Sequence, residues 1–345
     1  MIRRLWAAFL LAAVVSSGAA AEEVGHRILE FSDLEGWAFD NHEQALETFL
    51  VTCPDMRDPD WSALCALAQQ KPDAKSFFEL FFRPVLIGEE EDALFTGYFE
   101  PELDGALRPS ARYRYPVYRE PEVAKISNPW LTRKEIETGD YMRGKGYEIA
   151  WVDDPVELFF LQIQGSGRIR LPDGSRIRLG YGGSNGHPYR SIGVELVRRG
   201  IYNVHQVSAQ VIQNWVKRNP KEGQELLHHN PSYVFFRRVD HVPAEAGPLG
   251  AMNRSVTPKR SIAVDPAFYT LGAPVWVEKK GEGAFNRLMI AQDTGSAIKG
   301  PQRADIFFGT GDAAGRMAGK LRDPGRMVML VPIQRAFAMA TEPYQ

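Results

Sequence analysis

The chain has 345 residues, enough for about two domains of roughly 150 residues each, and its 41 basic and 43 acidic side chains leave a formal net charge of −2. This near balance excludes a protein that depends on a basic face for binding nucleic acid. A hydrophobic fraction of 44% with 11% aromatic residues excludes wholesale disorder, and two cysteines are too few for a cysteine-rich zinc module.

The N-terminus has the pattern of a secretory signal peptide. Arg3 and Arg4 precede an apolar run over 5–15, and small residues continue to Ala21. A retained membrane anchor is the alternative, but this uncharged stretch is shorter than the ~20 apolar residues that span a bilayer. We therefore expect a signal peptide over 1–21, cleaved after about Ala21, and no transmembrane segment in the mature chain. No cysteine lies near the cleavage site, so we expect no lipid anchor.

The two cysteines, Cys53 and Cys65, are close in sequence. An oxidising compartment outside the cytoplasm permits a disulfide between them. Two free buried thiols are the alternative. Asp58, which lies between them, is a candidate N-cap for a helix that contains Trp61. A catalytic cysteine is not expected, because neither residue has an activating context nearby in the sequence.

In chain order, helical periodicity comes first and strand patterns dominate afterwards. Apolar residues recur at three- and four-residue spacing over 41–51, 61–70 and 74–82, with Asp73 as the cap of the third helix. Strands are predicted at 93–100, 113–118 and 157–164, and 168–179 is predicted to form a hairpin that turns at Asp173–Gly174. Helices are then predicted at 190–199, 208–218 and 220–229. The last predicted elements are strands at 233–238, 261–265, 274–278, 287–292, 304–308 and 327–331, with a short helix at 313–321.

Several kinds of site have no support in the sequence. No His-x-x-x-His or Cys-x-x-Cys spacing occurs, so we expect no metal site and no cofactor. The glycine-rich segment 180–186 lacks the Lys-Ser/Thr of a P-loop. We interpret it either as turn chemistry of the backbone or as part of a sugar-lined cleft. A Gly-x-Ser-x-Gly nucleophile motif is also missing.

Three aspartates remain as candidates for acid–base chemistry. Asp265 and Asp293 follow strand-like runs, and Asp305 lies within one. Burial raises the pKa of a carboxyl group and suits it to protonating a leaving oxygen. We interpret Asp265, which precedes Pro266, mainly as a turn cap or buried backbone acceptor, and Asp293 could equally form a turn. Asp305, flanked by Arg303 and two phenylalanines, has the strongest case as a catalytic acid.

Six short blocks resemble one known family in the same order. They are FTGYFEP (95–101), LQIQGSG (161–167), GYGGSNGHPY (180–189), SIAVDP (261–266), AQDTGSAIKG (291–300) and RADI (303–306). The last three are similar to the three-aspartate (3D) domain. Together the six resemble the membrane-bound lytic murein transglycosylase A (MltA) family over about 95–331.

The resemblance implies a mainly β protein with helices (α+β) in two domains. A double-psi β-barrel domain would comprise 22–102 and 240–345, with the 3D domain at about 259–331. A smaller β domain, 103–239, would be inserted into it. Glycan strands of peptidoglycan would lie in a groove between the two domains.

The resemblance also implies a reaction. Asp305 matches the family's single catalytic aspartate, which would protonate the β-1,4 glycosidic oxygen between N-acetylmuramic acid and N-acetylglucosamine. The carboxylate would then help to deprotonate the muramyl C6 hydroxyl, which closes a 1,6-anhydro ring without water. The positions that would contact substrate are Thr96, Gly97, Tyr98, Gln164, Ser166, Gly167, Asp293 and Lys299, with Asp265 in a supporting or structural role.

Two other functions stay open at this point. A two-carboxylate glycoside hydrolase would pair Asp293 with Asp305 and use water. A non-catalytic protein would bind wall polysaccharide without turnover. The expected partners are glycan strands and other cell-wall enzymes, with no nucleic acid. Because the chain lacks the cysteine for the lipid anchor that the family name implies, we expect a soluble periplasmic enzyme or one that is held by the cell wall itself.

Overall fold

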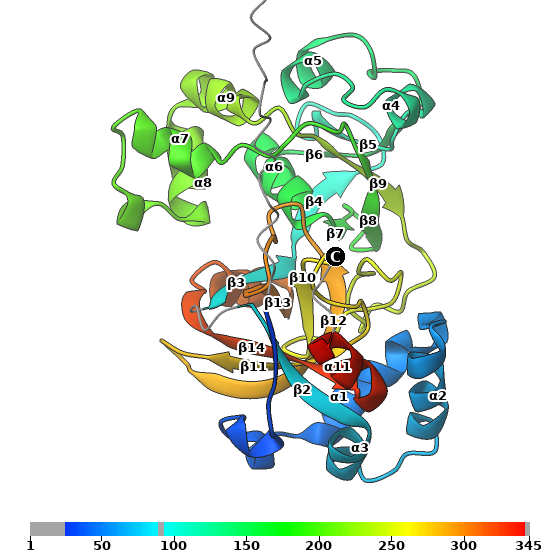
Figure 1. Cartoon of the computed structure of the whole chain (residues 1–345). Coiled ribbons are helices and arrows are strands. Elements are labelled where there is room, and N and C mark those ends of the chain that lie inside the picture. Colours follow the sequence, from blue (N-terminus) through cyan, green and yellow to red (C-terminus); the bar gives the residue numbers. More distant parts are fainter. Residues whose placement is uncertain (1–24, 89–92, 342–345) are drawn as a thin grey trace, which may run out of the picture.

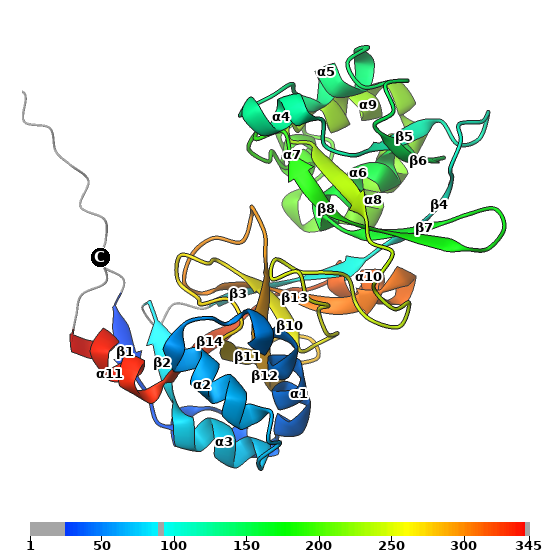
Figure 2. The ribbon, with the colours of Figure 1, turned by 90° about the vertical axis from the view of Figure 1, so that its right-hand side faces the viewer.

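The computed structural model describes residues 25–88 and 93–341, so the expected signal peptide over 1–21 lies outside the described residues. Two sheets organise the chain, one built from both ends of the sequence and one from its middle. Figure 2 shows them as two lobes, with the middle of the chain forming the upper one.

The first sheet closes into a barrel. The strands in it are, in spatial order, β1 (His26–Ile28), β2 (Phe82–Ile87), β14 (Arg322–Pro332), β11 (Pro274–Lys279), β12 (Phe285–Thr294), β10 (Ser261–Val264), β13 (Arg303–Thr310) and β3 (Ala93–Glu100). A further pairing of β14 with β3 closes the last six of these strands into a ring. The pairs β10–β12 and β13–β3 are parallel, and the other pairs are antiparallel. The predicted α+β class with a β-barrel is confirmed.

Three helices cover one side of the barrel, namely α1 (His42–Thr52), α2 (Pro59–Ala68) and α3 (Ala74–Phe81) (Figure 1). Each begins within two residues of its predicted start, and the side chains of Asn41, Asp58 and Asp73 accept hydrogen bonds from the backbone of the first turn. The fully buried Phe49, Phe78 and similar residues of these helices join the barrel core. The helix α11 (Ile333–Thr341) lies against β1, β2 and β14, and α10 (Gly311–Ala318) lies against β3 and β13.

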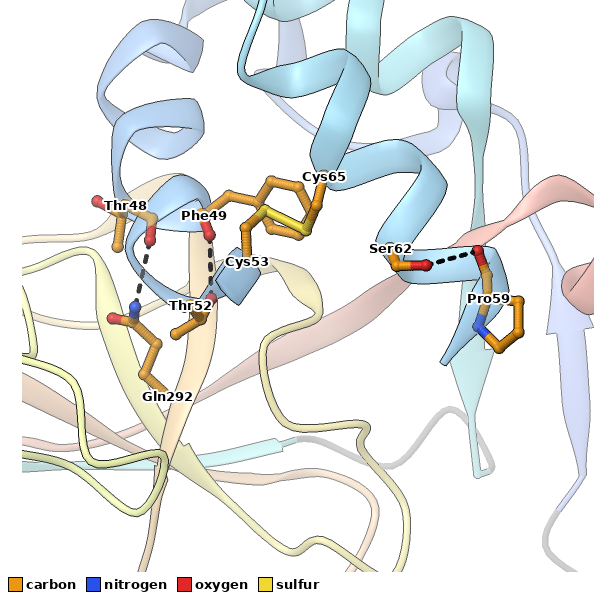
Figure 3. Close-up of a disulfide and its surroundings, with 8 residues drawn as sticks. All are labelled: Thr48, Phe49, Thr52, Cys53, Pro59, Ser62, Cys65 and Gln292. Atoms are coloured by element: carbon orange, nitrogen blue, oxygen red, sulfur yellow. Dashed lines mark hydrogen bonds between the residues drawn. A yellow bond between two sulfur atoms is a disulfide. The ribbon is translucent and has the colours of Figure 1, made fainter. Parts of the chain in front are cut away.

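A disulfide joins Cys53 and Cys65, which settles the choice between a bridge and free thiols (Figure 3). It links the short 3₁₀ helix Cys53–Asp55, which follows α1, to α2. In the same region the amide of Gln292 on β12 donates to the carbonyl oxygen of Thr48 at 3.2 Å. The disulfide therefore links two parts of the helical cover, and the Gln292 hydrogen bond links this cover to β12, the strand that contains Asp293.

The second sheet has the order β5 (Tyr115–Tyr118), β6 (Glu148–Val152), β4 (Glu102–Ala106), β7 (Gly167–Arg170), β8 (Arg176–Ser184) and β9 (Val234–Arg238). The helices around it are α4 (Glu122–Ile126), α5 (Arg133–Thr138), α6 (Pro155–Gln164), α7 (Ile192–Arg198), α8 (Ala209–Arg218) and α9 (Pro220–His229). The predicted hairpin is the β7–β8 pair, in which Asp173 accepts from the Ser175 backbone at 2.9 Å. Further 3₁₀ turns lie at Phe31–Asp33, Trp37–Phe39 and Val204–Gln206.

The glycine-rich segment 180–186 has a backbone explanation. Most of it belongs to β8, whose register with β9 shifts between Tyr181 and Gly183. A Cβ on Gly182 would lie 2.6 Å from the backbone of Phe236. Glycine is therefore needed for the close approach of two strands.

The strand predicted at 157–164 is wrong, because this segment is the helix α6. Asp154 caps it by accepting from the backbone of Val156 and Glu157, and Pro155 occupies its first position. Gly165 ends it in the left-handed conformation, with a φ of 75°. A short apolar run fits a buried strand and a buried helix equally well, and in this run the capping residues decide.

A buried carboxylate, Glu100, joins the two sheets. Its side chain is fully buried and pairs with Arg168 at 2.9 Å and Arg178 at 3.0 Å, both from the second sheet. From the barrel, the Thr310 hydroxyl donates to it at 2.7 Å. A charge taken out of water needs such partners, since desolvation costs several kcal/mol per ion.

We expect Glu100→Gln to lower the free energy of unfolding by about 3 kcal/mol, because it leaves two buried arginines without their carboxylate. Glu102→Gln is the matched control, since Glu102 also pairs with two arginines, Arg170 and Arg176, whose side chains are about half exposed. It should cost less than about 1 kcal/mol. Urea denaturation measures both, and equal losses in the two variants would contradict the assignment of Glu100 as the junction.

Candidate active site

The strand register of the barrel places two of the three aspartates, Asp293 and Asp305, beside the same residue of the strand between them. Ala263 on β10 is the partner of Asp293 on β12 and of Asp305 on β13. On the other side of β13, Asp305 pairs with Thr96 on β3. Asp293 and Asp305 are thus two strand spacings apart, or about 10 Å between their Cα atoms. The four strands lie side by side in the middle of Figure 1.

Asp305 is half-buried and makes one hydrogen bond. The Thr96 hydroxyl donates to Oδ1 at 2.7 Å. The other oxygen, Oδ2, accepts from no described residue and is not completely buried. Burial raises the pKa of Asp305, while the Thr96 hydroxyl and the positive charge of Arg303 oppose that rise. Asp305 therefore combines a raised pKa with one unpartnered oxygen, as a proton donor requires.

Asp293 differs from Asp305 because both of its oxygens are occupied. Oδ1 accepts from the backbone of Ala251 at 3.0 Å and Thr294 at 2.9 Å, and Oδ2 accepts from the Tyr98 hydroxyl at 2.9 Å. Burial raises the pKa of Asp293 to about 6, against the effect of these donors. Asp293 thus anchors Tyr98 and the loop at 251, and each of its oxygens already accepts at least one hydrogen bond.

Asp265 directly follows β10, the strand that lies between Asp293 and Asp305, and it has partners of its own. It is buried, and it accepts from the backbone of Gly300 at 3.0 Å and Ala267 at 3.2 Å. Lys299 donates to it at 3.5 Å, and these donors hold the pKa of Asp265 below its usual range although burial opposes them. The Lys299 side chain is itself 64% exposed. Asp265 and Lys299 form a pair that holds the loop after β12.

The remaining predicted contacts come from β3 and from the end of α6. Gln164 accepts from the Phe99 backbone at 3.0 Å, so it ties α6 to β3, and Ser166 is buried beside it. A Cβ on Gly97 would lie 2.7 Å from the Ala318 Cα, so glycine lets α10 pack against β3. A Cβ on Gly167 would overlap the Leu161 side chain.

The structure shows how Arg303, which flanks Asp305 in the sequence, is connected to it. Its Nη2 donates to the Thr96 hydroxyl at 2.8 Å. The sequence carries a signal for this neighbour, since residues two apart on a strand share a face.

Across the described ranges no cluster of His, Cys, Asp or Glu has the composition of a metal site. Within 25–88 and 93–341 no helix has both the length and the apolar character needed to cross a membrane.

Comparison with known proteins first defines the class. The chain matches the model of the MltA specific insert domain over residues 94–237 and that of the 3D domain over 260–331. It is 32% identical over 272 residues to the membrane-bound lytic murein transglycosylase A of Vibrio cholerae, covering 74% of this chain and 71% of that protein. Fold and sequence thus define the class of protein as one with a β-barrel, an inserted sheet and a 3D domain. The chain belongs to the MltA family.

Solved structures agree with this assignment. The crystal structure of a membrane-bound lytic murein transglycosylase from Agrobacterium tumefaciens has a TM-score of 0.81 at 30% identity, covering 91% of this chain and 99% of that one. MltA from Neisseria gonorrhoeae has a TM-score of 0.78 at 34% identity, with coverages of 91% and 94%. Escherichia coli MltA with bound chitohexaose has a TM-score of 0.73 at 26% identity, with coverages of 89% and 94%.

The raised pKa of Asp293 predicts a pH-dependent stability. Between its unfolded value near 3.8 and about 6, the folded state binds the extra proton, so this group stabilises the protein at low pH and the stabilisation is lost as pH rises. We expect Asp293→Asn to gain up to about 3 kcal/mol relative to the natural chain between pH 4 and pH 7. Urea denaturation across this range measures the difference.

Asp265→Asn is the control with the opposite sign. The lowered pKa of Asp265 gives stability that is present above about pH 4 and is lost as pH falls. This variant should therefore be least stable, relative to the natural chain, at neutral pH. Parallel stability curves for the natural chain and Asp293→Asn would show that the carboxyl group titrates normally and would contradict the prediction.

Proposed function

We propose that the protein is a lytic transglycosylase that cleaves the β-1,4 bond between N-acetylmuramic acid and N-acetylglucosamine in peptidoglycan and leaves 1,6-anhydromuramic acid ends. One observation carries the proposal: a single half-buried carboxyl group, Asp305, has a raised pKa and one oxygen without a partner among the described residues. Membership of the MltA family supplies the substrate class.

The reaction needs one group that first gives and then takes a proton. Neutral Asp305 donates its proton to the glycosidic oxygen as the C1–O bond breaks, so N-acetylglucosamine leaves with its hydroxyl group restored. The resulting carboxylate accepts the proton of the muramyl C6 hydroxyl, whose oxygen forms the new bond to C1. Asp305 ends neutral, as it began. Because the nucleophile belongs to the substrate, no second carboxylate is needed, and this agrees with the structural contacts of Asp293, whose oxygens hold Tyr98 and the backbone of Ala251 and Thr294.

Substrate would lie between a barrel domain, 22–102 and 240–345, and an inserted domain, 103–239. The candidates for contact on the barrel side are Thr96, Gly97, Tyr98, Asp293 and Lys299, and on the inserted side Gln164, Ser166 and Gly167. A structural relative that binds chitohexaose supports a β-1,4-linked glycan as ligand. Export to the periplasm would bring the enzyme to this substrate, and its nearly neutral charge suits a largely uncharged sugar chain.

We expect Asp305→Asn to lower the formation of anhydro ends by at least about 100-fold, since the amide has no acidic proton to give. The measurement is mass spectrometry of purified murein sacculi after digestion. Asp312→Asn is the matched control, because this exposed aspartate lies on α10. It should retain the activity of the natural chain.

The same digestion separates the alternatives. In heavy-oxygen water a two-carboxylate hydrolase would place the label in reducing-end muramic acid, whereas a transglycosylase incorporates none. A wall-binding protein would bind sacculi and release nothing. Labelled reducing ends, or binding without any product, would overturn the proposed function.

A further inference from the structure

Arg303 lies beside Asp305, yet it has no carboxylate partner of its own within 25–88 and 93–341. It is half-buried on β13, two residues before Asp305. Its guanidinium donates to the carbonyl oxygens of Leu94 at 3.2 Å and Ala304 at 2.5 Å, and to the Thr96 hydroxyl at 2.8 Å. Among the described residues, no Asp or Glu makes an ion pair with it. Removing an unpaired charge from water is costly, so a role at this site would explain why arginine stands here.

The Thr96 hydroxyl connects Arg303 with Asp305. A guanidinium has no acceptor and stays protonated, so Nη2 can only donate to Thr96 Oγ1. The hydroxyl has one proton of its own and gives it to Asp305 Oδ1 at 2.7 Å. A hydrogen bond from a cation polarises the hydroxyl and strengthens its donation to the next group. Arg303 thus favours Oδ1 as an acceptor.

The direction of the hydrogen bond from Thr96 to Asp305 matters because a neutral carboxyl group carries its proton on one oxygen only. When Oδ1 accepts from Thr96, the proton belongs on Oδ2. Oδ2 is the oxygen that has no partner in the described part of the chain. The acidic proton is then on the oxygen that a glycosidic bond could reach.

We propose that Arg303 is a positioning residue, which acts through the Thr96 hydroxyl to direct the acidic proton of Asp305 to Oδ2. The inference rests on the transglycosylase function proposed above. It adds a residue that contacts no reacting atom but determines which oxygen of Asp305 carries the acidic proton. Its positive charge also opposes the rise in the pKa of Asp305 that burial causes.

Other charged and titratable groups lie near Asp305 on the neighbouring strands. Asp293 on β12 and Tyr98 on β3 are close enough for the charge of Asp305 to raise their pKa values. On β14, Arg322 lies opposite Thr96 in register, and its charge acts on Arg303. Arg322 is exposed and is therefore a suitable control for a general loss of positive charge.

The kinetic test compares the pH dependence of anhydro-end formation in Arg303→Met, Arg303→Lys and Arg322→Met. Neutral Asp305 is the active form, so activity falls as pH rises through its pKa. Removing the Arg303 charge raises that pKa and should move the alkaline limb up by about one pH unit. We expect kcat to fall about tenfold in Arg303→Met because the proton is no longer directed, with KM little changed. Arg303→Lys should restore the limb, and Arg322→Met should match the natural chain.

A second measurement needs no substrate. NMR of protein labelled at the aspartate carboxyl carbons gives the pKa of Asp305 directly, with Asp305→Asn identifying its signal. The pKa should rise in Arg303→Met and in Thr96→Val, which removes the hydroxyl at nearly constant shape. If Arg303→Met does not fold, the same pKa measurement in Thr96→Val and Arg303→Lys tests the proposal.

The outcomes separate the two proposals. An unchanged pKa of Asp305 in folded Arg303→Met, or a change in KM alone, would overturn the role of Arg303 whatever the turnover. A natural chain that forms no anhydro ends would overturn the proposed function, whatever the titration shows.

Discussion

The parallel pairing of β13 with β3 is the constraint on which the rest of the molecule depends. It joins residues more than 200 positions apart, and it places Thr96 against Asp305. The same strand, β3, also pairs with β14 and so closes the barrel. Beyond Glu100 the chain continues into β4 of the second sheet. One strand therefore sets the geometry around Asp305 and the point from which the second lobe begins.

Charges inside the molecule fall into two groups with different surroundings. At structural junctions the buried charges pair with opposite charges, as Asp40 does with Arg260 at 2.7 Å or Glu100 with Arg168 and Arg178. Around Asp305 the partners are incomplete, because Oδ2 accepts nothing from the described residues and Arg303 has no carboxylate. An ion pair favours the charged form of a carboxyl group, whereas the incomplete set of partners leaves Asp305 able to exchange a proton.

Local features of the fold were predictable from the sequence, and long-range ones were not. Capping aspartates marked α2 and α3, and Asp173–Gly174 marked the β7–β8 turn, because these signals lie within a few residues of the structure they specify. The periodicity of the short apolar run in α6 fits a helix and a strand equally well, so it could not predict which of the two forms. The position of Asp305 within an apolar strand pattern identified it as the candidate catalytic acid. Its contact with Thr96, and the link from there to Arg303, depend on strand pairing across the inserted segment, which only the family resemblance suggested.

The insertion has a consequence for the order in which the molecule is made. β3 leaves the ribosome early, but its partners β13 and β14 follow only after the six strands and six helices of the second lobe. Domains tend to fold as units during or after synthesis, and pairing over long sequence separations is slow. The second lobe can thus mature while the barrel is still an open set of strands. Thr96 and Asp305 cannot meet before residue 305 has been made, so the chain acquires its reactive centre only when most of it is present.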